Sequence, residues 1–180
     1  MKHNDIMPEC YIDTTLVESL LYAKVNHKHS CNEVAKEMKS GKYKDTFAVG
    51  IIDNDKRKLS YIDEFDEIGR TDNLTFLKHK VKHQYLIKVG KEYKAMETFI
   101  KENVFALGMK MEDFGLPSDL DSLIITTKDR ISTQKDPRIL KLFKALQQSP
   151  EVGKLKNVLD YLATNRYKAN EEILKAMILG

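Results

Sequence analysis

The sequence has few cysteines, glycines and prolines, and it has no long hydrophobic run. Its two cysteines, Cys10 and Cys31, are too few for the disulfide framework of a small secreted domain, so a reducing cytoplasm is the simplest compartment. No segment approaches the roughly 20 consecutive apolar residues of a membrane-spanning helix. The initial MKHNDIMPEC lacks the apolar centre of a secretory signal. The sequence also lacks internal repeats and low-complexity tracts.

The composition is that of a globular protein. Of the 180 residues, 42% are hydrophobic and 32% are charged, and this length suits one compact domain or a domain with a small appendage. The formal net charge is +3, and the pI is about 8.7. This mild excess of base permits a nucleic acid as a partner but does not require one, because lysine also keeps ordinary proteins in solution.

Hydrophobic periodicity predicts alternating strands and helices in the first part of the chain. The run FAVGII is continuously apolar, which is typical of a strand buried on both faces of a parallel sheet. The acidic stretch 63–68 is expected at the surface. The alternation predicts an α/β fold with a mainly parallel sheet. The predicted strands are residues 9–13, 47–52, 74–77 and 83–89, and the predicted helices lie around residues 16–21, 31–39 and 94–104.

From about residue 113 onward the pattern becomes helical. We therefore predict an α/β domain at residues 1–112 and a helical appendage at residues 113–180. The apolar stripes of the appendage are expected in the core or on a face that docks a protein partner. The signals for helix starts in this part are Ser118 with Asp121, Pro137, Ser149 with Pro150, and Asn170.

Acidic side chains follow the predicted strands. Asp13 ends the first, Asp53 and Asp55 follow the strand 47–52, and Glu97 lies in the helix after the strand 83–89. In open α/β sheets the functional residues gather at the carboxyl ends of the strands. A hard cation such as Mg²⁺ takes one or two carboxylates and leaves its other positions to water or phosphate oxygens.

This pattern fits phosphoryl transfer or phosphodiester cleavage. Under this hypothesis Asp13, Asp53 and Asp55 are catalytic, and the same three residues with Glu97 hold Mg²⁺ or Mn²⁺. A polar turn is the alternative for the Asp-x-Asp pair, because both of its side chains can accept hydrogen bonds from nearby backbone N–H groups.

The order of these acids resembles the Toprim fold, the catalytic domain shared by topoisomerases, primases and the overcoming-lysogenization-defect nucleases. The segment YIDTTLVESLL is similar to the first Toprim motif, with Asp13 in place of the family's glutamate. FAVGIIDNDKR resembles the Asp-x-Asp strand. YLIKVGKEYKAMETFIKEN resembles a strand and helix of small Toprim-like proteins of uncertain function, in which Glu97 takes the acidic place.

The resemblance covers residues 9–105 and implies a three-layer Toprim-like domain. It also implies a magnesium-dependent nuclease or phosphotransferase that acts on DNA or RNA. Asp13 is one methylene shorter than glutamate, and Thr14 stands where the family has a glycine. The second hypothesis is therefore a catalytically inactive Toprim-like module that binds a partner protein or a nucleic acid.

Two groups of basic residues are candidates for contact with nucleic-acid phosphates. Lys56 and Arg57 directly follow the aspartate pair. Lys78, Lys80 and Lys82 lie in the run KHKVKH. The alternative for this run is a solvated loop, or an edge strand that lysine protects from aggregation.

Other motifs give weaker signals. His27, His29 and Cys31 suggest zinc, but a zinc site normally has four ligands and no second Cys/His pair is present, so a polar loop is preferred. His27 could instead carry protons near the acids. A receiver-like phosphoacceptor domain also places acids at strand ends. It ranks lower, because no lysine-bearing last strand is evident.

Overall fold

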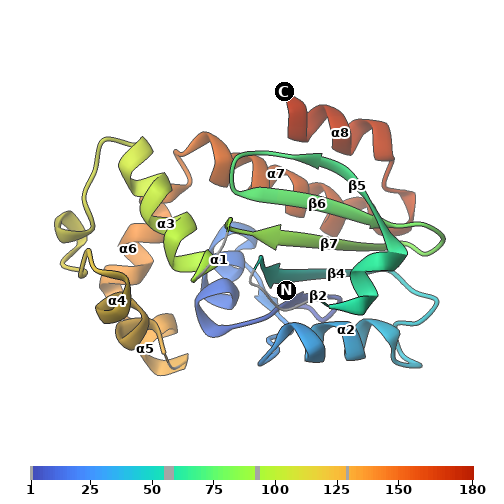
Figure 1. The fold of residues 1–180 in the computed structure, drawn as a ribbon, viewed down its shortest axis with the longest axis horizontal. Coiled ribbons are helices and arrows are strands. Elements are labelled where there is room, and N and C mark those ends of the chain that lie inside the picture. The colour runs from blue at the N-terminus through green and yellow to red at the C-terminus, as the bar shows by residue number, and fades with distance from the viewer. Residues whose placement is uncertain (1, 55–58, 92–93, 129) are drawn as a thin grey trace.

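The computed structural model describes residues 2–54, 59–91, 94–128 and 130–180 (Figure 1). The strands are β1 (Lys2–His3), β2 (Ile6–Pro8), β3 (Lys24–Val25), β4 (Ala48–Asp53), β5 (Phe65–Arg70), β6 (Leu74–His79) and β7 (Gln84–Val89). The α-helices are α1 (Tyr11–Leu21), α2 (Cys31–Lys39), α3 (Ala95–Ala106), α4 (Leu120–Thr127), α5 (Arg130–Lys135), α6 (Pro137–Leu146), α7 (Pro150–Asn165) and α8 (Glu171–Leu179). The described residues also form the short 3-10 helices η1 (Ser60–Glu64), η2 (Met111–Phe114) and η3 (Arg166–Lys168).

The main sheet has five strands in the order β2-β4-β7-β6-β5, and it is mixed. The pairs β2–β4 and β4–β7 are parallel, whereas β7–β6 and β6–β5 are antiparallel. The expectation of a mainly parallel sheet was therefore wrong. The reason is that only short turns join β5, β6 and β7, and short turns connect antiparallel neighbours, whereas a parallel pair needs a long crossover.

The first strand and helix begin earlier than the sequence predicted. The predicted strand 9–13 was wrong, because β2 ends at Pro8 and α1 begins at Tyr11. Asp13 occupies the third position of α1, where its Oδ2 accepts a hydrogen bond from the backbone N–H of Cys10 at 3.3 Å. This cap starts a helix in a stretch whose aromatic and β-branched residues suggested a strand.

The acidic stretch 63–68 was expected at the surface, but most of it belongs to strand β5. Phe65 and Ile68 are buried, and a bulge between Glu67 and Gly69 breaks the alternation that marks a strand. A Cβ atom at Gly69 would lie 2.9 Å from the side chain of Ile178, because α8 packs closely over this strand. Strand β5 could therefore not be predicted from its own residues alone, because its burial depends on α8.

The remaining predictions of strands and helices in the first part of the chain are confirmed by β4, β6, β7, α2 and α3. Capping signals were also informative. Ser30 Oγ accepts from Glu33 N at the start of α2, and Asn170 Oδ1 accepts from Glu172 N and Ile173 N at the start of α8. Ser149 is the N-cap of α7, with Pro150 in its first turn.

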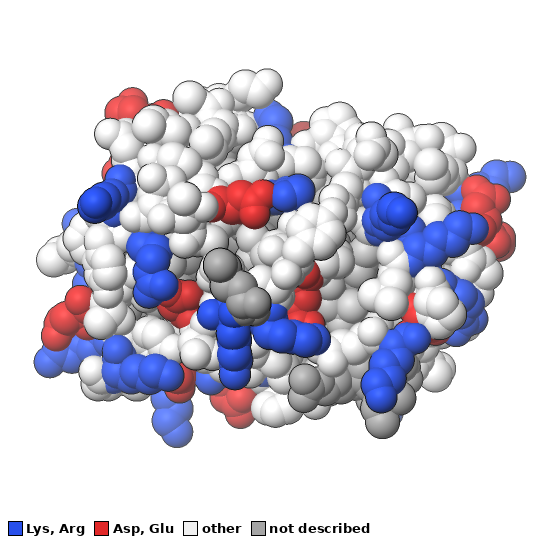
Figure 2. All heavy atoms as spheres, turned by 180° about the vertical axis from the view of Figure 1, so that it is seen from behind, with Lys and Arg blue, Asp and Glu red and all other residues white. Residues whose placement is uncertain are grey.

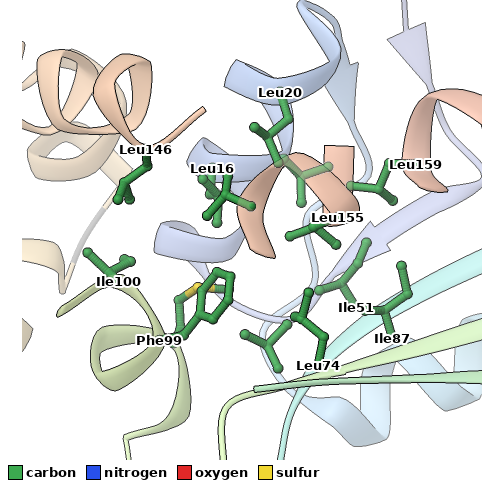
Figure 3. Close-up of a cluster of buried hydrophobic side chains, with 14 of the residues drawn as sticks. Leu16, Leu20, Ile51, Leu74, Ile87, Phe99, Ile100, Leu146, Leu155 and Leu159 are labelled. Atoms are coloured by element: carbon green, nitrogen blue, oxygen red, sulfur yellow. The ribbon is translucent and has the colours of Figure 1, made fainter. Parts of the chain in front are cut away.

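Helices cover both faces of the sheet. On one face α2 packs over the buried cluster that includes Met38, Ile52 and Leu86. On the other face one larger cluster joins the sheet to α1, α3, α6, α7 and α8. Figure 3 shows the part of this cluster formed by the sheet, α1, α3, α6 and α7. This cluster contains residues from both sides of position 113, so the C-terminal helices and the sheet share one core. Among the described residues, no helix has the length and apolarity needed to cross a membrane.

Glu151, in the first turn of α7, holds the turn between β5 and β6. Its carboxylate accepts hydrogen bonds from Thr71 Oγ1, from Asn73 N at 2.7 Å and from Asn73 Nδ2 at 3.0 Å. We expect Glu151→Ala to lower the free energy of unfolding by about 2 to 4 kcal/mol, because buried donors of Asn73 lose a charged acceptor.

Urea unfolding would measure this loss. Glu172→Ala is the matched control, since this glutamate occupies the first turn of α8 but its side chain is largely exposed beside Lys175. Equal losses in the two variants would show that Glu151 does not hold the turn.

Candidate functional site

Strands β2, β4 and β7 run in the same direction and end at one edge of the sheet. Glu9 directly follows β2, and Asp53 is the last residue of β4. The backbone N–H of Asp53 donates to Glu9 Oε2 at 2.9 Å, and the N–H of Glu9 donates to Ile51 O at 2.9 Å. This pairing of two strand ends brings the Glu9 and Asp53 side chains to the same edge.

Asp13 reaches this edge from the first turn of α1, and its side chain is fully buried. Its Oδ1 has no hydrogen-bond partner among the described residues. Burial raises the pKa of Asp13 to about 7; hydrogen bonds from Cys10 oppose this shift, and the negative charges of Glu9 and Glu97 add to it. The site therefore favours a proton or a cation on this carboxylate.

Glu97 completes the set from the first turn of α3, which follows β7 after a tight turn at Gly90. Burial raises the pKa of Glu97 as well, and Thr127 Oγ1 of α4 donates to its Oε1 at 3.3 Å. We call Glu9, Asp13, Asp53 and Glu97 the acid cluster. Figure 1 shows α3 and α4 beyond the end of β7 toward which its arrow points.

The structure thus brings together three acids named from the sequence, namely Asp13, Asp53 and Glu97. Asp55, Lys56 and Arg57 lie outside the described residues. Glu9 was missed. It is the acid that directly follows the first strand, the place that was given to Asp13, and it was missed because residues 9–13 were predicted to be that strand. Asp13 is a helix-capping residue in the structure, and interpreting it as one in the sequence could have moved the predicted start of the helix to before residue 13.

The lysines of the run KHKVKH are not near the acid cluster. They lie at the end of β6 and in the turn before β7. This is the end of the sheet at which β4 and β7 begin, since their first residues, Ala48 and Gln84, are paired. Lys80 Nζ donates to Asp63 O at 2.9 Å, and Lys82 Nζ lies 5.6 Å from the centre of the Tyr61 ring. Lys78, Lys80 and Lys82 therefore occupy the opposite end of the sheet from the acids.

A pocket of about 330 Å³ lies beside the acid cluster. The side of the pocket formed by the first turn of α1 and the loop before α2 contains Tyr11, His27 and His29. Glu97 and Lys128 also line the pocket, together with Cys10, Ile12, Ile124 and Thr127. Cys31, the first residue of α2, is buried and does not line the pocket, so the three zinc candidates do not share it.

In the part of the chain that the structure describes, no three His, Cys, Asp or Glu side chains are arranged to hold a metal ion. The acid cluster is consequently a set of neighbouring acids at the strand ends, in which Glu9 and Glu97 act electrostatically on Asp13, and not a preformed coordination sphere. Seen from behind, the molecule has Lys and Arg side chains spread over its surface with acidic side chains among them (Figure 2).

Compared with protein-family models, with curated proteins and with solved structures, the chain has no significant match. The function is therefore argued from the residues and their geometry.

Proposed function

We propose that the chain is a nuclease or phosphotransferase that acts on nucleic acid with Mg²⁺ or Mn²⁺, and that its domain is Toprim-like. The observation that carries the proposal is the acid cluster, which gathers carboxylates from the ends of two parallel strands and the starts of two helices. Asp13 is fully buried, and burial disfavours the charged form of a carboxylate unless a proton or a cation compensates its charge.

The donor set fits a hard divalent cation. Carboxylate oxygens are the ligands that Mg²⁺ prefers, and Asp13 Oδ1 is a buried oxygen without a partner among the described residues. A bound cation would polarise a phosphate oxygen and lower the pKa of a water molecule. Because no three side chains among the described residues are arranged for a metal, we expect carboxylate rotations in the acid cluster on binding.

The identity of the first acid supports the Toprim-like proposal. Glu9 directly follows β2 and is a glutamate, as in the first motif of the family, and Cys10 then stands in the place of the family's glycine. The backbone of Cys10 is extended, with φ at −126°, so this position does not require glycine.

Cleavage assays on single-stranded and double-stranded DNA and RNA test the proposal. We expect cleavage with millimolar Mg²⁺ or Mn²⁺, and a loss of about 100-fold or more in Asp53→Asn, since changes around metal sites commonly cost 10-fold to 100-fold. Asp160→Asn is the control, because Asp160 pairs with Lys156 on the surface of α7. The proposal is refuted if no nucleic acid is cleaved and calorimetry detects no binding of either metal.

One observation favours a second candidate, a non-catalytic module that binds nucleic acid or a protein. The described residues hold no preformed metal site. This candidate predicts binding to nucleic acid in fluorescence anisotropy without added metal and without cleavage, with the same affinity in Asp53→Asn as in the wild type. Metal-dependent cleavage would reject it.

A further inference from the structure

The loop from Asn26 to His29 is fixed beside β2. The backbone N–H groups of Asn26 and Lys28 donate to Ile6 O and Pro8 O, both at 2.9 Å, so the loop runs along the outer edge of that strand. Along an extended segment every second side chain points to the same side, which places His27 and His29 together. Glu33 Oε2 accepts from the backbone N–H of His29 at 3.0 Å and fixes the end of the loop.

The two imidazole rings pack against Tyr11. The rings of Tyr11 and His27 are stacked, with centroids 4.2 Å apart and an interplanar angle of 14°. His29 stands edge-on to both rings, at 5.9 Å from Tyr11 and 4.7 Å from His27. The three rings thus hold one another in fixed orientations at the pocket beside the acid cluster.

The hydrogen bonds of Thr14 assign the protons of both histidines. Thr14 Oγ1 donates its one hydrogen to Cys10 O at 2.7 Å, so its 2.8 Å contact with His27 Nδ1 must use a hydrogen on that nitrogen. Nε2 of a neutral His27 is then an acceptor, and it lies 3.3 Å from His29 Nδ1. His29 therefore carries a hydrogen on Nδ1, and its Nε2 is left to exchange a proton with a ligand.

We propose that His29 is the general acid of the reaction and that the pocket binds the leaving nucleoside of a phosphodiester. This inference rests on the proposed function. The pocket, at about 330 Å³, is at the lower end of the range of about 300 to 1,000 Å³ for small-molecule sites. The charged groups around it are Glu97 and Lys128, with Glu33 at the backbone of His29.

The proposed hydrolysis of the phosphodiester needs no reactant other than water. A water oxygen forms a bond to phosphorus while the bond from phosphorus to the leaving oxygen breaks. The leaving oxygen takes a proton from Nε2 of His29, and the attacking water releases one proton to the solvent. His29 then regains a proton from the solvent, while its Nδ1–H stays donated to His27 throughout.

A comparison of two leaving groups tests the role of His29. Thymidylyl-thymidine releases an alkoxide that needs a proton, whereas thymidine 5′-(4-nitrophenyl phosphate) releases 4-nitrophenolate, which does not. With Mg²⁺, we expect His29→Gln to slow the first substrate by about 100-fold to 10,000-fold and to leave the second nearly unchanged. His83→Gln, an exposed histidine at the other end of the sheet, should affect neither.

Equal slowing of both substrates, or of neither, in His29→Gln would overturn the inference. If the wild type cleaves neither these substrates nor the longer DNA and RNA, and binds no metal, the proposed function fails, and the pocket is then tested by a binding measurement. Nitrogen NMR at a pH at which both imidazoles are neutral should place the remaining hydrogen of His29 on Nδ1, and thymidine 5′-phosphate should shift the His29 signals. The opposite tautomer or the absence of a shift would overturn the inference independently of activity.

Discussion

Asp13→Asn is expected to make the protein more stable at alkaline pH and to remove much of the pH dependence of its stability. Burial raises the pKa of Asp13 to about 7 from its ordinary value of 3.8. Between these values the folded state holds a proton that the unfolded state has lost. Stability therefore falls as the pH rises from about 4 to about 7, by up to roughly 4 kcal/mol in total.

Asparagine cannot ionise, and its Oδ1 can still accept from the N–H of Cys10, so the helix cap is kept. Urea unfolding between about pH 4 and pH 8 would measure the effect. The control is Asp160→Asn, which should follow the wild type. Magnesium should stabilise the wild type at high pH and should stabilise Asp13→Asn less. Parallel curves for the wild type and Asp13→Asn would contradict this account of the buried carboxylate.

Gly90→Ala is expected to lower the free energy of unfolding by about 2 to 5 kcal/mol, the sum of a left-handed backbone penalty and a steric clash. Gly90 has φ at +78°, and an added Cβ would lie 2.5 Å from the backbone oxygen of Ala95. Because this clash is with the first turn of α3, relieving it must move Glu97 as well. Thermal or urea unfolding would measure the loss.

Two other glycines separate the causes. Gly108 has φ at +69° but open space around it, so Gly108→Ala should show only the strain of about 1 to 2 kcal/mol. Gly153 lies within α7, with open space and no positive φ, so Gly153→Ala should stabilise the protein by about 0.5 to 1 kcal/mol. A loss at Gly90 no larger than the loss at Gly108 would show that the contact with Ala95 is unimportant.

The elements that the sequence predicted well are those with local signals. The continuous apolar run of β4 and the cap Asn170 depend only on neighbouring residues. The failures depend on distant ones. The burial of β5 requires α8, and β2 has only three residues, too few to show a period. The direction of each strand is likewise set by the length of its connections, as the mixed sheet illustrates.

The same distinction applies to the site. Asp53 and Glu97 were predicted because acids after strands of a parallel sheet meet at one edge. The lysine run was a separate candidate for contact with phosphates, but it precedes β7 instead of following it, and so lies at the opposite end of the sheet from the acids. His27 was considered near the acids as a proton carrier, but the place of His29 was not predicted, because it depends on hydrogen bonds between its loop and β2.

The most direct test of the central claim, that the acid cluster binds a divalent cation, is a crystal of the full chain soaked in Mn²⁺ at alkaline pH. We predict an anomalous scattering peak in contact with the carboxylates of Glu9, Asp13 and Asp53, which should be absent in Asp53→Asn. A well-ordered crystal with millimolar Mn²⁺ and no peak at this edge of the sheet would contradict the claim.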